Sequence, residues 1–145
     1  MTDLPHITVA TLIERDNRYL LVKELSNGQT VYNQPAGHVE HGEALQAAAI
    51  RETLEETCWE VELTGLLGIY QHTSSGNGIS YVRICFTARP ARQRNDLSLD
   101  KDIQSIHWMT AEEIRLQASR LRSPMVLRAV EDYREGRIFP LQICR

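Results

Sequence analysis

The stretch from Gly37 to Glu56, GHVEHGEALQAAAIRETLEE, constrains this chain more than any other. Its fixed points are a glycine, a glutamate after five residues, an Arg-Glu pair after seven more, and a Glu-Glu pair two residues later. The part from Glu43 to Glu56 is rich in Ala, Leu, Glu and Gln and contains no Gly or Pro, which predicts a helix. Pro35 and Gly37 break regular structure upstream. We therefore expect a strand, then a loop from Gly37 to Gly42, then this helix.

A helix over this range has two chemically different faces, because successive residues turn by about 100°. One stripe is apolar and is expected to pack against the rest of the protein, whereas the opposite face displays carboxylates. The apolar stripe comprises Ala47, Ile50, Leu54 and Cys58, and the acidic face comprises Glu52, Glu55 and Glu56.

The three carboxylates repel one another, since like charges one turn apart destabilise a helix. A hard divalent cation would offset this repulsion, because Mg²⁺ takes oxygen ligands and commonly bridges carboxylates to substrate phosphates. The simpler alternative is a solvated acidic face, relieved by an ion pair between Arg51 and Glu55 at i, i+4. The upstream Gly37, together with Glu43 and Arg51, favours the metal site.

The segment resembles the signature of the Nudix hydrolases, G-x5-E-x7-R-E-U-x-E-E-x-G-U, in which U is aliphatic. Three positions depart from it: Thr53 and Trp59 replace aliphatic residues, and Cys58 replaces the second glycine. A glycine there would close the helix in the left-handed conformation. Cys58 must therefore bear a steric cost, or the helix ends differently. The matching positions are Gly37, Glu43, Arg51, Glu52, Glu55 and Glu56.

The resemblance implies a Mg²⁺ cofactor, with Mn²⁺ as an alternative, and assigns roles to the matching residues. Glu52 and Glu56 are the expected metal ligands, supported by Glu55, with Glu52 also acting as general base or orienting the attacking water. A backbone carbonyl at Ala36 or Gly37 is expected to add a ligand. Arg51 is expected to orient the carboxylates. Glu43 is expected to join the network of contacts around Arg51, and Glu55 to support the same cluster.

Family members often use one more acidic residue from outside the signature. Asp96, Asp100 and Asp102 are all available, and the sequence does not choose between them.

Candidate substrate-binding residues lie outside the helix. Arg83 is predicted to grip a phosphate from a strand, with an ordinary strand-edge arginine as the alternative. Gln34 and His38 flank the loop and are candidates to donate to the substrate. Tyr81 or Trp108 would stack on a base, unless these aromatic residues pack in the core.

Composition narrows the class of protein. With 145 residues, 42% of them hydrophobic, the chain suits one domain spanning 1–145. It contains neither a basic start followed by an apolar run nor a long apolar segment, so we expect a cytoplasmic protein without a membrane partner. Three scattered cysteines predict reduced thiols.

Charge is distributed unevenly along the chain. Residues 1–81 carry 4 basic and 11 acidic side chains, and residues 82–145 carry 12 basic and 8 acidic ones. An acidic half that holds a cation beside a basic half that holds an anion suits a metal-phosphate site. No basic stripe indicates a nucleic-acid partner. Arg122 is a candidate for reaching an anion, and the chain is expected to be a monomer or a homodimer.

Alternation of apolar residues and turn signals predicts the remaining elements. Together they indicate an α/β protein, and the resemblance implies the Nudix fold, an α/β/α sandwich with a mixed β-sheet. Strands are expected at 6–15, 19–24, 31–34, 61–72, 79–89 and 103–109, a polar loop at 90–102, and helices from a capping box at Thr110 and from Ser123-Pro124.

The resemblance extends beyond the signature to a subgroup of bacterial Nudix phosphatases. It implies hydrolysis of nucleoside di- and triphosphates, and of the pyrophosphorylated pyrimidine precursor of thiamine, with release of orthophosphate. Two alternatives remain: cleavage of internal pyrophosphates such as those of dinucleotides, and nucleotide sensing without catalysis. The complete acidic set favours an enzyme. The similar segments are NQPAGH at 33–38, VRI at 82–84, LRSPMV at 121–126 and RIFPL at 137–141.

Overall fold

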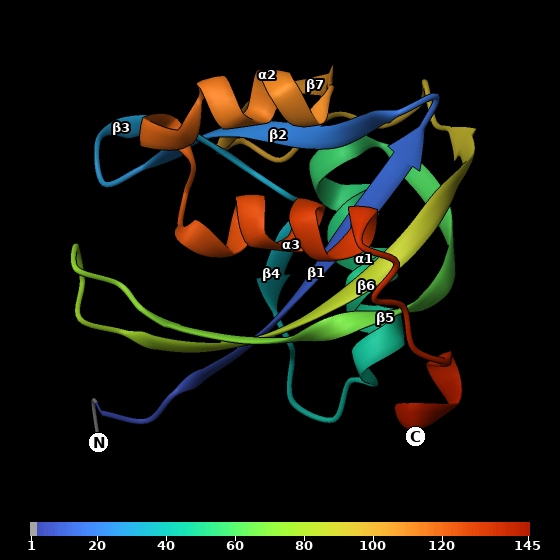
Figure 1. Ribbon diagram of the computed structural model, residues 1–145, viewed down its shortest axis with the longest axis horizontal. Helices are drawn as coiled ribbons and strands as arrows, with labels where there is room; N and C mark the ends of the chain where they lie inside the picture. Colours follow the sequence, from blue (N-terminus) through green and yellow to red (C-terminus); the bar gives the residue numbers. More distant parts are fainter. Residues whose placement is uncertain (1–2) are drawn as a thin grey trace.

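A mixed sheet of seven strands forms the centre of the computed structural model, which describes residues 3–145 (Figure 1). The order is β3-β2-β1-β6-β5, with β4 pairing to β1 and β7 pairing to β2. β1 runs parallel to β6, whereas the other pairs are antiparallel. The strands are β1 (His6–Arg15), β2 (Arg18–Ser26), β3 (Gln29–Asn33), β4 (Ala36–His38), β5 (Trp59–Thr73), β6 (Ser80–Gln93) and β7 (Ile103–Met109). The helices are α1 (Leu45–Thr57), α2 (Ala111–Leu116) and α3 (Pro124–Arg134), with 3₁₀ turns η1 (Ala118–Arg120) and η2 (Leu141–Ile143).

The two faces of β1 pack against different helices, because side chains alternate along a strand. Ala10 belongs to a cluster with Val126 and Val130 of α3. Its neighbour Val9 belongs to a cluster with Ala48 of α1. Figure 1 shows α3 on one side of the sheet and α1 on the other. The predicted α/β/α sandwich with a mixed sheet is therefore confirmed.

Several turns form as their residues predict. Asp16 and Asn17 join β1 to β2 with φ of 52° and 64°, the left-handed backbone typical of a two-residue hairpin. The capping box at Thr110 forms with Glu113. Ser123 caps α3 by accepting from the backbone N–H of Met125.

Two loop predictions were wrong in extent. The chain around Gly37 is not a loop, because 36–38 forms β4 and pairs with β1. β6 does not end before Pro90 but continues to Gln93, still paired with β5. Pro90 is tolerated because it lies opposite Val61, next to a shift in register between the two strands, where a missing N–H costs least.

The buried face of α1 also differs from the prediction. Ile50 is 40% exposed, and the buried residues are Ala48, Ala49, Thr53, Glu56 and Thr57. The small side chains let the helix approach β1 closely. Thr53 Oγ1 donates to the carbonyl of Ala49 at 2.8 Å and lies within hydrogen-bond distance, 3.0 Å, of Thr11 Oγ1. The buried face predicted from hydrophobic periodicity was wrong because α1 buries small and polar residues instead of its largest apolar ones.

Cys58 ends α1 in the left-handed conformation, with φ 61° and ψ 19°. The helix therefore ends as it would with a glycine at this position, and Cys58 bears the steric cost that a glycine would avoid.

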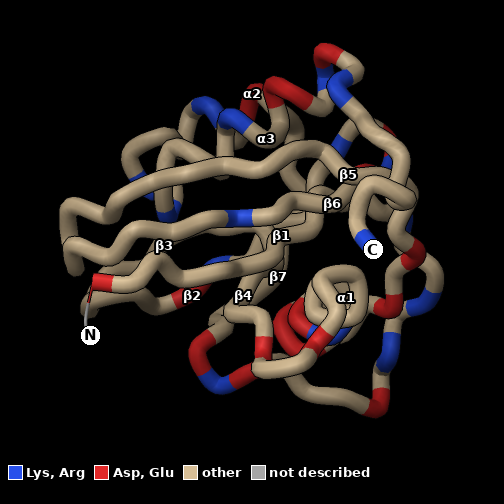
Figure 2. The backbone as a smooth tube through the Cα atoms, turned by 90° about the horizontal axis from the view of Figure 1, so that it is seen from below, with Lys and Arg blue, Asp and Glu red and all other residues tan. Residues whose placement is uncertain are grey.

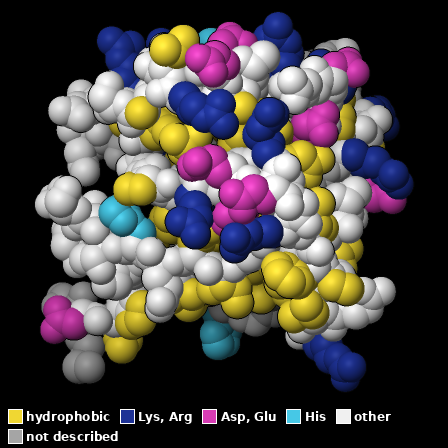
Figure 3. Space-filling model, in the orientation of Figure 1, with side chains coloured by type: hydrophobic (Ala, Val, Ile, Leu, Met, Phe, Trp, Pro, Cys, Tyr) yellow, Lys and Arg dark blue, Asp and Glu magenta, His cyan; other side chains and the backbone are white. Residues whose placement is uncertain are grey.

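The face covered by α2 and α3 carries acidic and basic side chains interspersed with one another (Figure 3). Some of them pair within the helices, such as Arg115 with Glu112 and Arg128 with Asp132. No helix within residues 3–145 is long and apolar enough to cross a membrane.

Candidate active site

The last turns of α1 lie against β4. Gly37 has no side chain, and a Cβ at this position would overlap the carboxylate of Glu52. The Glu52 carboxylate can lie this close to the backbone of β4 because position 37 is a glycine.

Arg51 organises the acidic side chains around it. Its Nε and one terminal nitrogen donate to the two oxygens of Glu43 at 2.7 and 2.9 Å. The other terminal nitrogen donates to Glu52 at 2.9 Å and to Glu55 at 3.3 Å. This pairing holds the pKa of Glu43 at about 2 and raises that of Arg51. The arginine thus joins the start of the signature to its acidic end.

Glu56 is buried and has a different environment. Its Oε1 accepts from the backbone N–H of Ala36 at 2.9 Å. Within residues 3–145, no Lys or Arg forms an ion pair with it. Burial raises the pKa of Glu56 to about 9, and repulsion from Glu24 and Glu52 adds to the effect. Burial also raises the pKa of Glu52. A nearby cation would hold both groups ionised.

These residues suit a hard divalent cation. The side chains of Glu52, Glu55 and Glu56 are carboxylates, and the glycine at position 37 leaves room for the Glu52 carboxylate beside β4. In residues 3–145, no three His, Cys, Asp or Glu side chains form a preformed metal cage. Mg²⁺ keeps several waters and shares its remaining ligands with substrate phosphates. We call Glu52, Glu55 and Glu56, with Arg51 and the backbone of Ala36 and Gly37, the acidic site.

The structure distinguishes the three candidate aspartates. Figure 2 shows the segment between β6 and β7 passing close to α1, and the backbone N–H of Asp100 donates to the carbonyl of Glu55 at 3.1 Å. The charge of Asp100 contributes to the raised pKa of Glu52 and Glu56. Asp96 instead pairs with Arg94 at 2.6 Å, and Asp102 lies against β2, where its carbonyl accepts from the backbone N–H of Leu25 at 3.2 Å. Asp100 is therefore the one that adjoins the acidic site.

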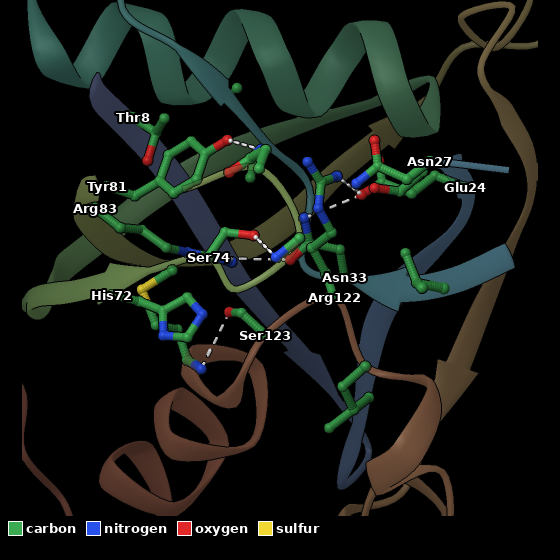
Figure 4. A pocket seen from close by; sticks show the side chains of 18 of the residues that line it. Thr8, Glu24, Asn27, Asn33, His72, Ser74, Tyr81, Arg83, Arg122 and Ser123 are labelled. Carbon is green, nitrogen blue, oxygen red and sulfur yellow. Dashed lines mark hydrogen bonds and ion pairs between the residues drawn. The ribbon is translucent and has the colours of Figure 1, made fainter. Parts of the chain in front are cut away.

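A cavity of about 450 Å³ opens beside the acidic site (Figure 4). We call it the polar cavity. Ala36, Gly37 and Glu56 form part of its wall, so the acidic site and the cavity are continuous. The rest of the wall comes from β2, β3, β6, the turn between β5 and β6, and the segment that leads into α3.

Arg83 lines the polar cavity and is 4% exposed. Its terminal nitrogens donate to Asn33 Oδ1 at 3.2 Å and to Gln34 Oε1 at 2.8 Å. Among residues 3–145 no carboxylate lies within ion-pair distance of it, and burial lowers its pKa. Neutral oxygens therefore hold the guanidinium in place, and its positive charge is available to bind an anion.

Gln34 does not line the cavity. It is 1% exposed, and its amide accepts from Arg83 and donates to the carbonyl of Val126 at 2.8 Å. Both ends of its amide are occupied, so its placement suits the positioning of Arg83 rather than direct contact with a substrate. His38 does line the cavity, and one of its ring nitrogens lies 2.9 Å from Nδ1 of His6.

The two candidate stacking residues lie in different places. Tyr81 lines the polar cavity, where its hydroxyl accepts from Asn77 at 3.1 Å. Trp108 lies elsewhere and packs against Trp59, with the guanidinium of Arg15 4.2 Å from its ring centroid. Trp108 therefore belongs to a packing cluster.

Among the residues of the cavity wall, sequence reasoning missed Glu24 and Asn33 and left Arg122 open. Glu24 lines it and is 7% exposed, and Asn33 lines it at the end of β3. Arg122 reaches Glu24 at 2.7 Å. The only signal for Glu24 in the sequence was an acidic residue near the end of an apolar strand. The pairing of β2 with β3, which brings Asn33 to Glu24, depends on the tertiary structure and could not be read from the sequence.

Comparisons with known proteins agree with this geometry. The model of the NUDIX domain family matches residues 4–129. The phosphatase NudJ of Escherichia coli strain K12 is 36% identical over 139 residues, covering 96% of this chain and 90% of NudJ. The chain belongs to the Nudix family. The Nudix resemblance of the signature is thus confirmed, and this protein is a Nudix hydrolase, an enzyme of a family that generally uses divalent metal ions and small nucleotide substrates.

Solved structures support the same family. A NUDIX hydrolase from Nitrosomonas europaea is 40% identical, with a TM-score of 0.95 over 98% of this chain and 97% of that one. The Nudix domain of Shewanella oneidensis NrtR, solved with ADP ribose, is 18% identical, with a TM-score of 0.71 over 92% of this chain and 89% of that one. The second likeness shows the Nudix fold alone.

Proposed function

We propose that this Nudix hydrolase is a Mg²⁺-dependent phosphatase of nucleoside di- and triphosphates and related pyrophosphates, and that it releases orthophosphate. The main support is that the acidic site opens directly into a cavity that also contains the buried cation Arg83. Carboxylates at one side and a guanidinium at another suit a metal-bound polyphosphate. The relative NudJ is a phosphatase, which supports orthophosphate as the product. The pyrophosphorylated thiamine precursor, implied by the resemblance of the sequence, is a further proposed substrate.

Mg²⁺ held by Glu52, Glu56 and a carbonyl of Ala36 or Gly37 would neutralise phosphate charge and lower the pKa of a bound water. Mn²⁺ suits the same oxygen donors. Asp100 is the residue from outside the signature that would join this set.

The chain's own residues then have distinct tasks. Glu52 accepts the proton of the attacking water, since its carboxylate is held at the junction of α1 and β4. Arg51 fixes the carboxylates of Glu52 and Glu55. Arg83 binds a phosphate oxygen, which orients the polyphosphate. The water oxygen forms a bond to the terminal phosphorus as the anhydride bond breaks, and a nucleoside diphosphate leaves from a triphosphate.

The bond that breaks can be identified with GTP in ¹⁸O-labelled water. A quenched time course should show transient GDP and label in orthophosphate. Label in GMP or in intact pyrophosphate at the first turnover would reject attack at the terminal phosphorus.

A substrate panel tests the wider proposal. Nucleoside triphosphates and diphosphates should turn over with Mg²⁺ and stop in excess chelator. Faster cleavage of dinucleotides would identify an enzyme for internal pyrophosphates. Tight nucleotide binding without any turnover would instead identify a sensing domain.

A further inference from the structure

The polar cavity contains a buried cation and a buried anion that do not pair with each other. Arg83 and Glu24 are 4% and 7% exposed, and both line the cavity. Asn33 lies between them, accepting from Arg83 at 3.2 Å and donating to Glu24 at 3.2 Å. Figure 4 shows Asn33 between the two charged side chains. Because the neutral amide of Asn33 separates the two charges, each charged group can bind a different part of a ligand.

Glu24 is only partly satisfied by the protein. Its Oε1 accepts from both Asn33 at 3.2 Å and Arg122 at 2.7 Å. No residue within 3–145 donates to its Oε2. An ionised carboxylate only accepts hydrogen bonds, and Glu24 lines the cavity. Its Oε2 is therefore available to accept a hydrogen bond from a donor group of a ligand.

Charge decides which part of the ligand this is. Phosphate oxygens are anionic acceptors, so Glu24 repels them, whereas Arg83 attracts them. The polyphosphate therefore lies toward Arg83 and the acidic site, and the nucleoside lies toward Glu24.

The neighbours of Glu24 favour a planar ring over a sugar. Val31 is its direct partner across β2 and β3 and also lines the cavity. Leu121 adds apolar surface to the same wall. Directly opposed side chains in a sheet lie about 5 Å apart, so a ring resting on Val31 presents its edge to the carboxylate.

We propose that Glu24 determines substrate specificity by accepting a hydrogen bond from the exocyclic amino group of the substrate's base. The enzyme would then prefer amino-bearing nucleotides to those with a carbonyl oxygen or a hydrogen at that position. This inference rests on the proposed hydrolysis of nucleoside polyphosphates.

Three substrate pairs test the amino group: GTP against ITP, which differ by that group alone, and ATP against ITP and CTP against UTP, in which a carbonyl replaces it and the neighbouring ring nitrogen gains a hydrogen. In the wild type, kcat/KM should be at least about 10-fold higher for the amino-bearing member of one or more pairs, as expected when a buried charged acceptor loses its donor. In Glu24→Gln this preference should fall to about 2-fold or less, with turnover of ITP and UTP largely retained. Glu62→Gln is the matched control, because Glu62 pairs with Arg89 on the exposed surface and should keep the wild-type ratios.

Two outcomes would overturn the inference. Wild-type ratios near one in all three pairs would show that no amino group is recognised, whether or not the variant folds. An equal loss for every nucleotide in a folded Glu24→Gln variant would show that Glu24 acts on the metal or the fold. A wild type inactive toward all five nucleotides with Mg²⁺ would reject the proposed function itself, which separates that failure from the other two.

Discussion

Helices α1 and α3 cover opposite faces of the same sheet but are built differently. α3 begins with a Ser123 cap and proline at its first position, and its buried residues are apolar except for Asp132, which pairs with Tyr70 and Arg128. α1 has no side-chain cap, and its buried set includes the polar residues Thr53 and Glu56. α3 thus follows local rules closely, whereas α1 violates several of them.

The difference follows from what each helix does. α3 completes the core through apolar burial, which is the main source of stability. α1 must present carboxylates to a cavity, so charge lies at its buried edge, and it depends on Arg51 and close contact with β4. A helix that carries chemistry therefore needs tertiary support that a helix of the core does not.

Loss of the Glu56 charge should give the largest effect. We expect Glu56→Gln to lower kcat/KM by more than about 100-fold, because changes to groups that only support metal ligands already cost about 10- to 100-fold. The variant should also lose the rise in unfolding temperature that Mg²⁺ gives the wild type. Enzyme assays and thermal unfolding with and without Mg²⁺ measure both. Wild-type activity in this variant would remove Glu56 from the metal site.

Weakening the arginine network should come next. Arg51→Lys is expected to lower turnover by about 10- to 100-fold, since an ammonium group cannot make the paired contacts to Glu43 while holding Glu52. The Mg²⁺ concentration for half-maximal activity should rise. An unchanged metal requirement would show that α1 orders its carboxylates without Arg51.

The opposite pattern is expected in α3. Val130→Ala should destabilise the protein by about 2 kcal/mol, because it leaves a cavity at a fully buried site. kcat should stay within about 2-fold of the wild type, since the residue touches neither the acidic site nor the cavity. Urea unfolding measures the first quantity. The exposed Glu131→Ala serves as the control, and a marked drop in kcat in Val130→Ala would break the contrast between the two helices.

The smallest effect concerns the end of α1. Cys58→Gly removes left-handed strain but also a buried thiol, so a comparison with Cys58→Ala isolates the backbone contribution. We expect the glycine variant to be more stable than the alanine variant by about 1 kcal/mol, with both retaining activity. A loss of turnover as large as that of Glu52→Gln would place Cys58 in the chemistry instead.

Local signals in the sequence predicted most of the secondary structure and the acidic residues of the site. The Asp16-Asn17 hairpin, the capping box at Thr110 and the Ser123 cap all formed, because each depends on a few adjacent residues. The spacing from Gly37 to Glu56 identified the family for a similar reason. Fixed intervals along one helix determine which side chains share a face.

Only the tertiary structure decided what those residues contact. It buried Thr53 and Glu56 instead of Ile50, because the sheet accepts a small-residue face of α1 at close range. It placed Asp100 beside α1 through the loop that contacts Glu55, and it buried Gln34 where its amide accepts from Arg83. It also placed Asn33 between Arg83 and Glu24, residues 59 positions apart in the chain. The sequence alone determined which carboxylates share a face of α1, because their spacing is local to one helix, whereas the cavity forms only when distant strands pair.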